Sequence, residues 1–530
     1  MVFSCYVTGM NNYFSWYTHW FINSNQLDFK DRFFWIDIEQ YNKNSQKLYD
    51  KFIFKNWIFV TIVGYISNIR LLSDRYWVNF QDELELIHYF YSKYKFKRFS
   101  ELDWVYNICI YDWSDIYIFK DIFDSNKPLY YYKSSVWIIF SNTLKTILNK
   151  LPKKTFDPIS VNAFLYTEYM VPNKKTLIKH VYKIPPQKIL KYNIKTNQLR
   201  LVSYKQKNHK NLESDIIKLI DNNTRAIVQR TNYSNLWLAI SSGYDSNLLF
   251  HTVKEIQDGI TLFTIWGKEN NEIPTVKAMY WDLFQSNNIK HKSSIVESRI
   301  VDFLPDIVYR LEGYAFERGI FLQYQFAKLL MENHIWDVIL GEGADQIFDS
   351  TRATRNKRIA WCQLNTKFVG FLHDDFQLDY DIEFDVVLKK SWIMLSSFWI
   401  AWFYPFLSTD LLTLPNWQRT KYKSYYKNQV ENYLDPNLIK YIKKIWWSTD
   451  LWYLLEENKS ILLSIIKTKF IKNILWKRIY TILRDPQKYV TFIFQLVYLY
   501  IFSEIFLSWK YDNNLNNDGF EFTLHDLLGR

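Results

Sequence analysis

Two short loops in the second half of the chain carry residues suited to phosphate chemistry. The first, SSGYDS at residues 241–246, separates an apolar run from a helix-like run. Ser241 and Ser246 supply hydroxyl donors. Gly243 lets a phosphate group approach the backbone, and Asp245 can hold Mg²⁺. Because the loop leads into a helix N-terminus, with its free N–H groups and positive dipole end, it predicts a cradle for a phosphate chain.

The second loop, GEGADQIF at residues 341–348, directly follows the apolar run WDVIL. Two glycines flank Glu342, and Asp345 supplies another carboxylate. Mg²⁺ bound to a nucleotide usually takes one or two protein carboxylates together with phosphate oxygens. Asp245 and Asp345 are therefore the predicted magnesium ligands.

The elements that must position these loops alternate in pattern. A helical apolar stripe over residues 216–227 is followed by strand-like and helix-like runs in turn. The predicted strands are 236–241, 261–266 and 336–340, and the predicted helices are 246–256, 274–286 and 321–333. Such alternation is typical of a doubly wound α/β domain, in which ligands bind at the carboxyl ends of parallel strands. Both loops fall at such ends.

The rest of the chain has a different character. The first ~200 residues contain short β-rich runs at 57–66, 105–113, 116–122, 128–141 and 180–204, and a polar linker is predicted at 205–214. Beyond residue 390 the pattern predicts helices almost throughout. The longest apolar segment, 489–506, is interrupted by Gln495 and Glu504. We therefore expect a buried core helix there and no membrane span.

Composition sets broad limits. The chain has 530 residues, 48% of them hydrophobic and 23% charged, which fits a folded protein of two or three domains. The net charge is +12, but the lysines are scattered, so no nucleic-acid partner is predicted. Cys5, Cys109 and Cys362 lack metal-ligand spacing and cannot form a disulfide framework. With no signal-peptide pattern at the N-terminus, a cytoplasmic protein is expected.

The two loops together resemble the asparagine synthetase family, whose usual forms are SGGxDS and SGEGxDELF. The resemblance extends to YDWSDIYIFKDIFDSNKPLYYY (111–132), similar to the family's RDxxGxxPLYY segment, and to FLYTEYMVPNKKTLIKHVYKIPPQKIL (164–190), similar to YVPxxxTIFxxIxKLPPGxxL. It implies a mixed α/β and α+β fold. Residues 1–205 would form an Ntn-hydrolase-like sandwich of the class II glutamine amidotransferase type. Residues 206–530 would form an α/β PP-loop ATP-pyrophosphatase domain with a helical C-terminal part.

The part of the chain that resembles a glutaminase lacks the family's chemistry. The family uses an N-terminal cysteine whose own α-amine acts as base, whereas residue 2 is Val2 and Cys5 would need a four-residue trim. The Asn-Gly-Glu turn of the family reads Val-Gly-Tyr at residues 63–65, and Trp104 replaces the glycine that follows Asp103. We expect no glutaminase activity and a structural or substrate-binding role for this domain.

The synthetase part keeps the family's residues. In the family a carboxylate attacks the α-phosphorus of ATP, pyrophosphate leaves, and an amine attacks the resulting acyl-adenylate. Asp245 and Asp345 match the positions that bind Mg²⁺ and pyrophosphate. Glu342 matches a position that is glutamate or, in the β-lactam-forming branch, a tyrosine associated with deprotonating the nucleophile. The positions implied to contact the nucleotide, mainly through backbone, are Ala239, Ile265 and Gly341.

A catalytic lysine is also implied. In the family it lies eight residues after a proline, in a stretch like LPxxxxxRxxK. The segment LDPNLIKYIKKIWW (434–447) fits with Pro436 leading to Lys444, although Ile442 stands where the arginine is expected. Lys443 is the alternative.

Ser242 departs from the family, because it stands where the first loop usually has its first glycine. If the backbone there requires a positive φ, serine costs about 1 kcal/mol relative to glycine. If it does not, the hydroxyl of Ser242 can add a contact to the bound phosphates.

Loss of the glutaminase residues indicates that the nucleophile is an amine already on the substrate. Lasso-peptide macrolactam synthetases are the branch that this chain resembles most. That resemblance implies a precursor peptide as substrate, a leader-peptide protease as a further partner, and ATP and Mg²⁺ as cofactors. The alternatives are an ammonia-dependent asparagine synthetase, a β-lactam synthetase-like ligase, a PP-loop tRNA-modifying enzyme, and a pseudoenzyme that binds a nucleotide or a partner without turnover.

Overall fold

The chain folds into two compact units in the computed structural model, and each is described by itself. Unit 1 comprises Met1–Lys154, Asn173–Asn211 and Ser408–Thr413, and unit 2 comprises Thr155–Pro172, Leu212–Leu407 and Leu414–Arg530. The residues that the structure describes are 2–8, 19–23, 26–30, 34–39, 51–66, 68–102, 106–121, 128–135, 137–167, 174–185, 188–203, 215–230, 237–257, 259–268, 271–285, 289–314, 316–349, 389–412, 414, 418, 420–443, 449–475, 479–508 and 523–528. The division into functional domains at 205/206 stays a prediction.

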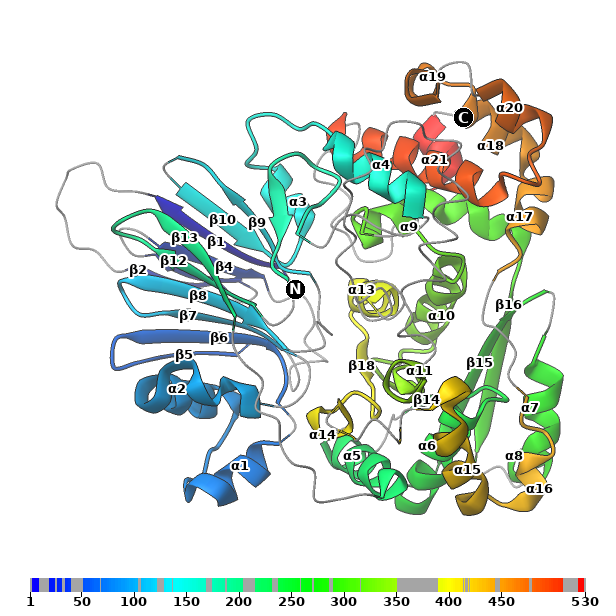
Figure 1. The fold of residues 1–530 in the computed structure, drawn as a ribbon, viewed down its shortest axis with the longest axis horizontal. Helices are drawn as coiled ribbons and strands as arrows, with labels where there is room; N and C mark the ends of the chain where they lie inside the picture. The colour runs from blue at the N-terminus through cyan, green and yellow to red at the C-terminus, as the bar shows by residue number, and fades with distance from the viewer. Residues whose placement is uncertain are drawn as a thin grey trace. The chain divides into compact units, whose positions relative to one another are not determined.

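Unit 1 contains two antiparallel sheets (Figure 1). The first has the order β11-β9-β10-β1-β4-β3-β2, and the second has the order β13-β12-β8-β7-β6-β5. The strands are β1 (Val2–Thr8), β2 (His19–Asn23), β3 (Gln26–Lys30), β4 (Phe34–Glu39), β5 (Lys51–Lys55), β6 (Ile58–Gly64), β7 (Tyr106–Tyr111), β8 (Asp115–Lys120), β9 (Tyr130–Lys133), β10 (Trp137–Ser141), β11 (Val181–Lys183), β12 (Lys188–Asn193) and β13 (Gln198–Ser203). The helices are α1 (Ile69–Tyr76), α2 (Glu83–Tyr94), the 3₁₀-helix η1 (Lys95–Glu101), α3 (Leu144–Leu148) and α14 (Thr409–Leu412).

Three of the predicted β-rich runs form the strands β6, β7 and β8, whose side chains are buried on both faces. Every residue of β7 is buried, as is nearly every residue of β6 and β8. A strand buried on both faces reads as a continuous apolar run, which is how these segments appear in the sequence. The sandwich expected for the N-terminal part of the chain is confirmed.

Unit 2 is built on a five-stranded sheet in which every described pairing is parallel. Its order is β16-β15-β14-β17-β18, with bounds β14 (Trp237–Ala239), β15 (Thr261–Gly267), β16 (Lys290–Val296), β17 (Asp337–Ile339) and β18 (Ala401–Phe403). From β14 the chain moves to β15 on one side and later returns to β17 on the other. The β14/β17 edge is therefore the topological switch point, where such sheets bind ligands. Both predicted loops follow these two strands.

The helices of unit 2 are α4 (Pro158–Thr167), α5 (Ile216–Arg230), α6 (Tyr244–Ile256), α7 (Ile273–Met279), α8 (Trp281–Gln285), η3 (Ser298–Phe303), α9 (Leu304–Leu311), α10 (Ile320–Glu332), α11 (Ala344–Phe348), α13 (Lys389–Ser397), η6 (Lys421–Lys423), α15 (Ser424–Tyr433), α16 (Pro436–Ile439), α17 (Leu451–Glu457), α18 (Lys459–Ile466), α19 (Lys469–Leu475), α20 (Ile479–Arg484), α21 (Val490–Phe502), the π-helical turn η8 (Ser503–Leu507) and α22 (Leu524–Leu528). Among them, α6, α7, α10 and α13 contact strands of this sheet, and the predicted helices 246–256, 274–286 and 321–333 correspond to α6, to α7 with α8, and to α10. The single helix predicted at 274–286 is two short helices that meet at Tyr280.

One element beyond residue 390 differs from the helical prediction. β18 is a strand, and all three of its residues are buried. A short apolar run that is fully buried has the same appearance in a sequence whether it is strand or helix. This run forms a strand because it pairs with β17, which gives the backbone of Ala401–Phe403 hydrogen-bonding partners in the sheet.

The long apolar segment near the C-terminus lies in the interior, as expected. Among the described residues, Val490–Leu507 is the one helical stretch with the length and composition to cross a membrane, and 67% of it is buried. It packs against α9, α18 and α4. The Gln495 amide, which interrupts the apolar pattern, donates to the Phe164 carbonyl at 2.8 Å. A polar side chain with a fixed partner inside the protein is typical of a core helix.

Candidate active site

The first loop forms a closed turn at the N-terminus of α6. The hydroxyls of Ser241 and Ser246 lie 3.0 Å apart, and the Ser241 N–H donates to the Ser246 hydroxyl at 3.0 Å. Gly243 caps the helix, so Asp245 lies in its first turn. The four predicted residues are thus brought together at the carboxyl end of β14, next to the free N–H groups of a 13-residue helix. Such a turn is suited to anion binding.

The structure excludes one of the two possibilities that the sequence left open for Ser242, the positive φ. Its φ is not positive, so the serine carries no left-handed strain. The residue is fully buried, and its N–H donates to the Glu272 carboxylate at 2.8 Å. Its hydroxyl donates to the Lys443 carbonyl at 3.0 Å. Both donors of Ser242 therefore have protein partners, and its predicted contact to phosphate stays a prediction.

The second loop approaches the first closely. A Cβ at Gly341 would lie 3.1 Å from the Ser246 backbone nitrogen. Gly343 has φ +102°, and a Cβ there would meet Leu407 Cδ2 at 2.8 Å. Only glycine fits both positions without displacement. The two glycines thus allow the Glu342 loop to lie directly against the start of α6.

The two predicted magnesium ligands converge on one cation of the protein, Lys423. Its ammonium donates to both carboxylate oxygens of Asp245, at 2.9 and 2.8 Å, and lies 2.6 Å from Asp345 Oδ1. The Lys423 side chain is 4% exposed, against 24% for Asp245 and 21% for Asp345. Burial disfavours the charged form of Lys423, but the two carboxylates outweigh burial and raise its pKa. The carboxylates therefore point at a common position that favours positive charge.

The turn that carries Lys423 has unusual backbone geometry. Tyr422 and Lys423 both adopt left-handed conformations, with φ of 56° and 59°. For residues other than glycine this costs about 1 kcal/mol or more each. The Tyr422 N–H donates to Asp349 Oδ1 at 3.0 Å, and Asp349 forms a β-bridge with Thr420. Contacts to the chain just after the second loop therefore hold the strained turn in place.

Glu342 lies in an environment that keeps its carboxyl group largely protonated at neutral pH. Its Oε2 atom has no solvent exposure, although the residue as a whole is half-buried. Burial raises the pKa of Glu342 to about 8, while hydrogen bonds from the Ser391 and Tyr404 hydroxyls act in the opposite direction. Ser391, in α13, donates to Glu342 Oε1 at 3.0 Å. A base with a pKa near 8 is matched to an α-amine, whose ordinary pKa is 7.7–8.0.

The remaining predicted residues lie around the same edge of the sheet or outside the described residues. Ala239 is the last residue of β14, and Ile265 is a buried residue of the neighbouring strand β15. Lys444 lies outside the described residues. Lys443 is described: its backbone N–H donates to the Ser242 carbonyl at 3.0 Å, and its side chain is exposed.

Sequence reasoning missed three residues of this site: Lys423, Ser391 and Glu272. Lysines are abundant in this chain, with 66 lysines and arginines in all, so one more lysine carries no local signal. Ser391 and Glu272 also stand in segments without a recognisable motif. Each of the three is brought to the loops by tertiary contacts alone.

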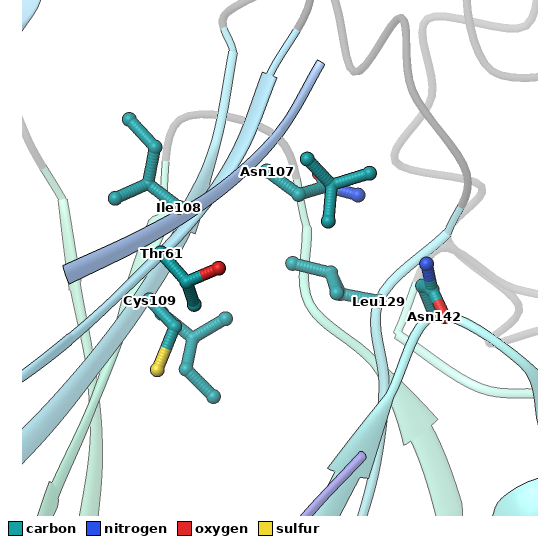
Figure 2. Close-up of a pocket in the computed structure, with 8 residues that line it drawn as sticks. Thr61, Asn107, Ile108, Cys109, Leu129 and Asn142 are labelled. Carbon is teal, nitrogen blue, oxygen red and sulfur yellow. The ribbon is translucent and has the colours of Figure 1, made fainter. Parts of the chain in front are cut away.

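Unit 1 contains a small pocket beside Val63, the first residue of the turn that replaces the family's Asn-Gly-Glu. Figure 2 shows this pocket, whose lining includes Thr61, Asn107, Cys109, Leu129 and Asn142. The free space is about 10 Å³, roughly what one water molecule needs. Burial raises the pKa of the Cys109 thiol, so it is a poor nucleophile.

The turn that replaces the family's Asn-Gly-Glu is also buried. Val63 and Tyr65 are 7% and 2% exposed, and Gly64 has φ 111°. Their side chains belong to the core and offer no amide or carboxylate for a substrate. Asp103 and Trp104 lie outside the described residues. The expectation that this unit is not a glutaminase is supported by these side chains and stays a prediction.

Comparisons with known proteins support the two-part organisation. A family model described as a glutamine amidotransferase domain matches residues 57–205, and one described as asparagine synthase matches residues 234–432. The chain is 30% identical over 183 residues to the microcin J25-processing protein McjC of Escherichia coli. The alignment covers 33% of this chain and 33% of that relative, so the chain matches about a third of the relative's length.

Solved structures resemble the chain only distantly. An allosteric regulatory enzyme of purine biosynthesis is 8% identical, with 55% of this chain and 74% of that chain covered and a TM-score of 0.25. The U34-tRNA thiolase NcsA from Methanococcus maripaludis is 14% identical, with 56% and 84% covered and a TM-score of 0.24. Scores this low carry no argument.

Proposed function

We propose that this chain, which belongs to the asparagine synthetase family, is an ATP-dependent carbon–nitrogen ligase that forms AMP and pyrophosphate. It closes a macrolactam in a precursor peptide. The carboxylate that is activated belongs to an Asp or Glu side chain of that peptide. The amine that attacks it is the peptide's own N-terminus. Similarity to a microcin J25-processing protein supports a peptide as the substrate.

The observation that carries the proposal is the convergence of Asp245 and Asp345. They come from different loops, yet three of their carboxylate oxygens lie within 2.9 Å of one nitrogen. Two carboxylates that face one position beside a helix N-terminus fit Mg²⁺ with a bound polyphosphate. These two residues would hold Mg²⁺, which supplies charge neutralisation for the leaving pyrophosphate.

In the first half-reaction an oxygen of the peptide carboxylate forms a bond to the α-phosphorus of ATP, and the bond from that phosphorus to the pyrophosphate oxygen breaks. The turn at residues 241–246 and the start of α6 hold the phosphates in line. Gly341 lets the second loop lie close to them. The products of this step are an acyl-adenylate and pyrophosphate.

In the second half-reaction the N-terminal amine forms a bond to the activated carbonyl carbon, and AMP leaves with the oxygen that joined it to that carbon. Glu342, in its carboxylate form, accepts the proton that the amine loses. Lys444, by its position in the sequence, would stabilise the negative charge on the carbonyl oxygen. Ring closure needs no ammonia, because the amine and the carboxylate belong to one molecule.

Unit 1 fits this proposal as a domain without glutaminase chemistry. Val63 and Tyr65 are buried and offer no amide or carboxylate to a glutamine, and the described pocket that Val63 lines has room for about one water molecule. A protease that removes a leader segment and frees the N-terminal amine would act before this enzyme. That protease is the partner we propose.

Pyrophosphate release tests the proposal. With ATP and Mg²⁺, release is expected only when a precursor peptide with a free N-terminus and an internal Asp or Glu is present, and mass spectrometry should show loss of one water from the peptide. Asp345→Asn serves as the inactive control. Release driven by free aspartate and ammonia would identify an asparagine synthetase instead. No release with any peptide, with nucleotide still bound, would identify a pseudoenzyme.

A further inference from the structure

The ammonium of Lys423 is fully engaged by the two predicted magnesium ligands. An ammonium has three N–H donors, and Lys423 has three carboxylate oxygens within hydrogen-bonding distance: Asp245 Oδ1 at 2.9 Å, Asp245 Oδ2 at 2.8 Å and Asp345 Oδ1 at 2.6 Å. A divalent cation that binds these carboxylates would therefore take the position of the ammonium.

Displacing the ammonium without replacing its partners is unfavourable. The Lys423 side chain is 4% exposed, so an ammonium pushed off the carboxylates remains inside the protein. A buried charge that loses its partner is strongly destabilising. A polyphosphate changes this balance, because its oxygens are anionic and can accept the same three N–H donors.

The backbone keeps Lys423 at this position. Its turn is left-handed at Tyr422 and Lys423, and Asp349 accepts the Tyr422 N–H. Tyr426, one turn later, stacks on Phe348 with ring centroids 4.5 Å apart and an interplanar angle of 7°. Since the backbone is tied to the last residue of the second loop and to the residue that follows it, the ammonium can change partners only by rotation of its own side chain.

We propose that Lys423 is an internal counter-ion that occupies the metal position between Asp245 and Asp345 until nucleotide arrives, so that the divalent cation binds together with the polyphosphate and not before it. When the nucleotide is bound, the ammonium moves from the aspartates to the phosphate oxygens. This inference rests on the proposed function for the nucleotide, but its first prediction concerns the protein with metal alone.

The test is Mn²⁺ binding to the full chain, measured by electron paramagnetic resonance of free Mn²⁺ without nucleotide. Wild type should bind Mn²⁺ weakly. Lys423→Met should bind it about tenfold or more tightly, because the competing charge is gone. Lys423→Arg, which keeps the charge, should bind as weakly as wild type. Lys421→Met is the matched control: it removes one positive charge two residues away, from an exposed side chain, and should leave Mn²⁺ affinity unchanged.

A second measurement guards against misfolding of Lys423→Met. In thermal denaturation without nucleotide, Mn²⁺ should raise the Tm of Lys423→Met and leave the Tm of wild type nearly unchanged. When α,β-methylene-ATP is added, wild type should also bind Mn²⁺ tightly. Equal Mn²⁺ affinity of wild type and Lys423→Met without nucleotide overturns the inference, and so does tightening by Lys421→Met to the same extent.

Failure of the proposed function is distinguishable from failure of this inference. If the metal-only results hold but no peptide supports pyrophosphate release, the counter-ion role stands and the ligase assignment falls. If pyrophosphate release with peptide is observed but Lys423→Met does not tighten Mn²⁺ binding, the ligase stands and the counter-ion role falls.

Discussion

Ser242 and Lys443, 201 residues apart in the chain, are joined by two hydrogen bonds of 3.0 Å. The Ser242 hydroxyl donates to the Lys443 carbonyl, and the Lys443 N–H donates to the Ser242 carbonyl. Ser242 stands where the family's first loop usually has glycine. In this chain it attaches the segment that leads into Lys444 to the first loop. The serine is a structural contact of the site and not a strained substitute for glycine.

Ser242→Ala removes one of these two bonds, and we expect the free energy of unfolding to fall by about 1 kcal/mol. Turnover should fall as well if Lys444 acts as proposed, because the segment that leads into Lys444 loosens. Denaturant unfolding and pyrophosphate release measure the two effects. Ser464→Ala, which removes a hydroxyl-to-carbonyl bond within α18, should leave turnover unchanged. Full activity of Ser242→Ala would show that the contact does not position the segment.

Asp245→Asn and Asp345→Asn should each lower pyrophosphate release by about 100-fold or more, because each removes a carboxylate from the metal position. Each change also leaves Lys423 with a weaker partner, so some loss of stability is expected in addition. Pyrophosphate-release assays at saturating Mg²⁺ measure the loss of turnover, and thermal unfolding followed by circular dichroism measures the loss of stability. Asp282→Asn, on the exposed face of α8, is the control. Turnover within tenfold of wild type in either variant would remove that carboxylate from the mechanism.

The pH dependence of ring closure should report Glu342. Its pKa is raised to about 8, so the protonated, inactive form dominates below pH 8 and the carboxylate above it. Activity should rise about tenfold per pH unit below pH 8 and level off above it. Glu342→Gln should be slow at every pH, and any rise that it keeps reports the peptide's α-amine, whose ordinary pKa is 7.7–8.0. A wild-type rate that is flat from pH 6 to 9 contradicts the assignment of Glu342 as base.

Ser391→Ala tests the same group through its hydrogen bond. The Ser391 hydroxyl donates to Glu342 Oε1 at 3.0 Å and lowers the pKa of that carboxyl. Loss of the hydroxyl should therefore shift the pH–rate profile toward alkaline pH while the maximal rate is retained. A purely structural role for Ser391 would reduce the rate at all pH values without moving the profile.

Gly343→Ala should destabilise unit 2 through two separate costs. The positive φ of Gly343 disfavours any Cβ, and the new Cβ would lie 2.8 Å from Leu407 Cδ2. We expect a loss of about 2–3 kcal/mol in the free energy of unfolding. Gly259→Ala is a matched control, because Gly259 has φ +76° and no atom within 4 Å of its Cβ position. Gly259→Ala should cost only about 1 kcal/mol. Equal losses would show that Leu407 gives way.

Substitution of the two adjacent lysines should identify the catalytic one. Lys443 contacts the first loop through its backbone, and its side chain is exposed. Lys443→Ala should therefore keep most of the activity, whereas Lys444→Ala should lower turnover by about 100-fold or more. A larger loss of turnover in Lys443→Ala than in Lys444→Ala would make Lys443 the catalytic lysine.

The sequence alone determined three of the five strands of the parallel sheet, β14, β15 and β17, and the loops that follow β14 and β17. Strand and helix periodicity are local properties of a chain, and parallel strands carry their ligands at one end, so Asp245 and Asp345 could be paired from the printed residues. Only the tertiary structure decided that β18 is a strand and that Lys423, Ser391 and Glu272 belong to the site. Each of these depends on a partner distant in the chain, and contacts of that kind leave no periodic pattern. The role of Ser242 was open for the same reason, because a side chain's partner is fixed by packing and not by its neighbours in sequence.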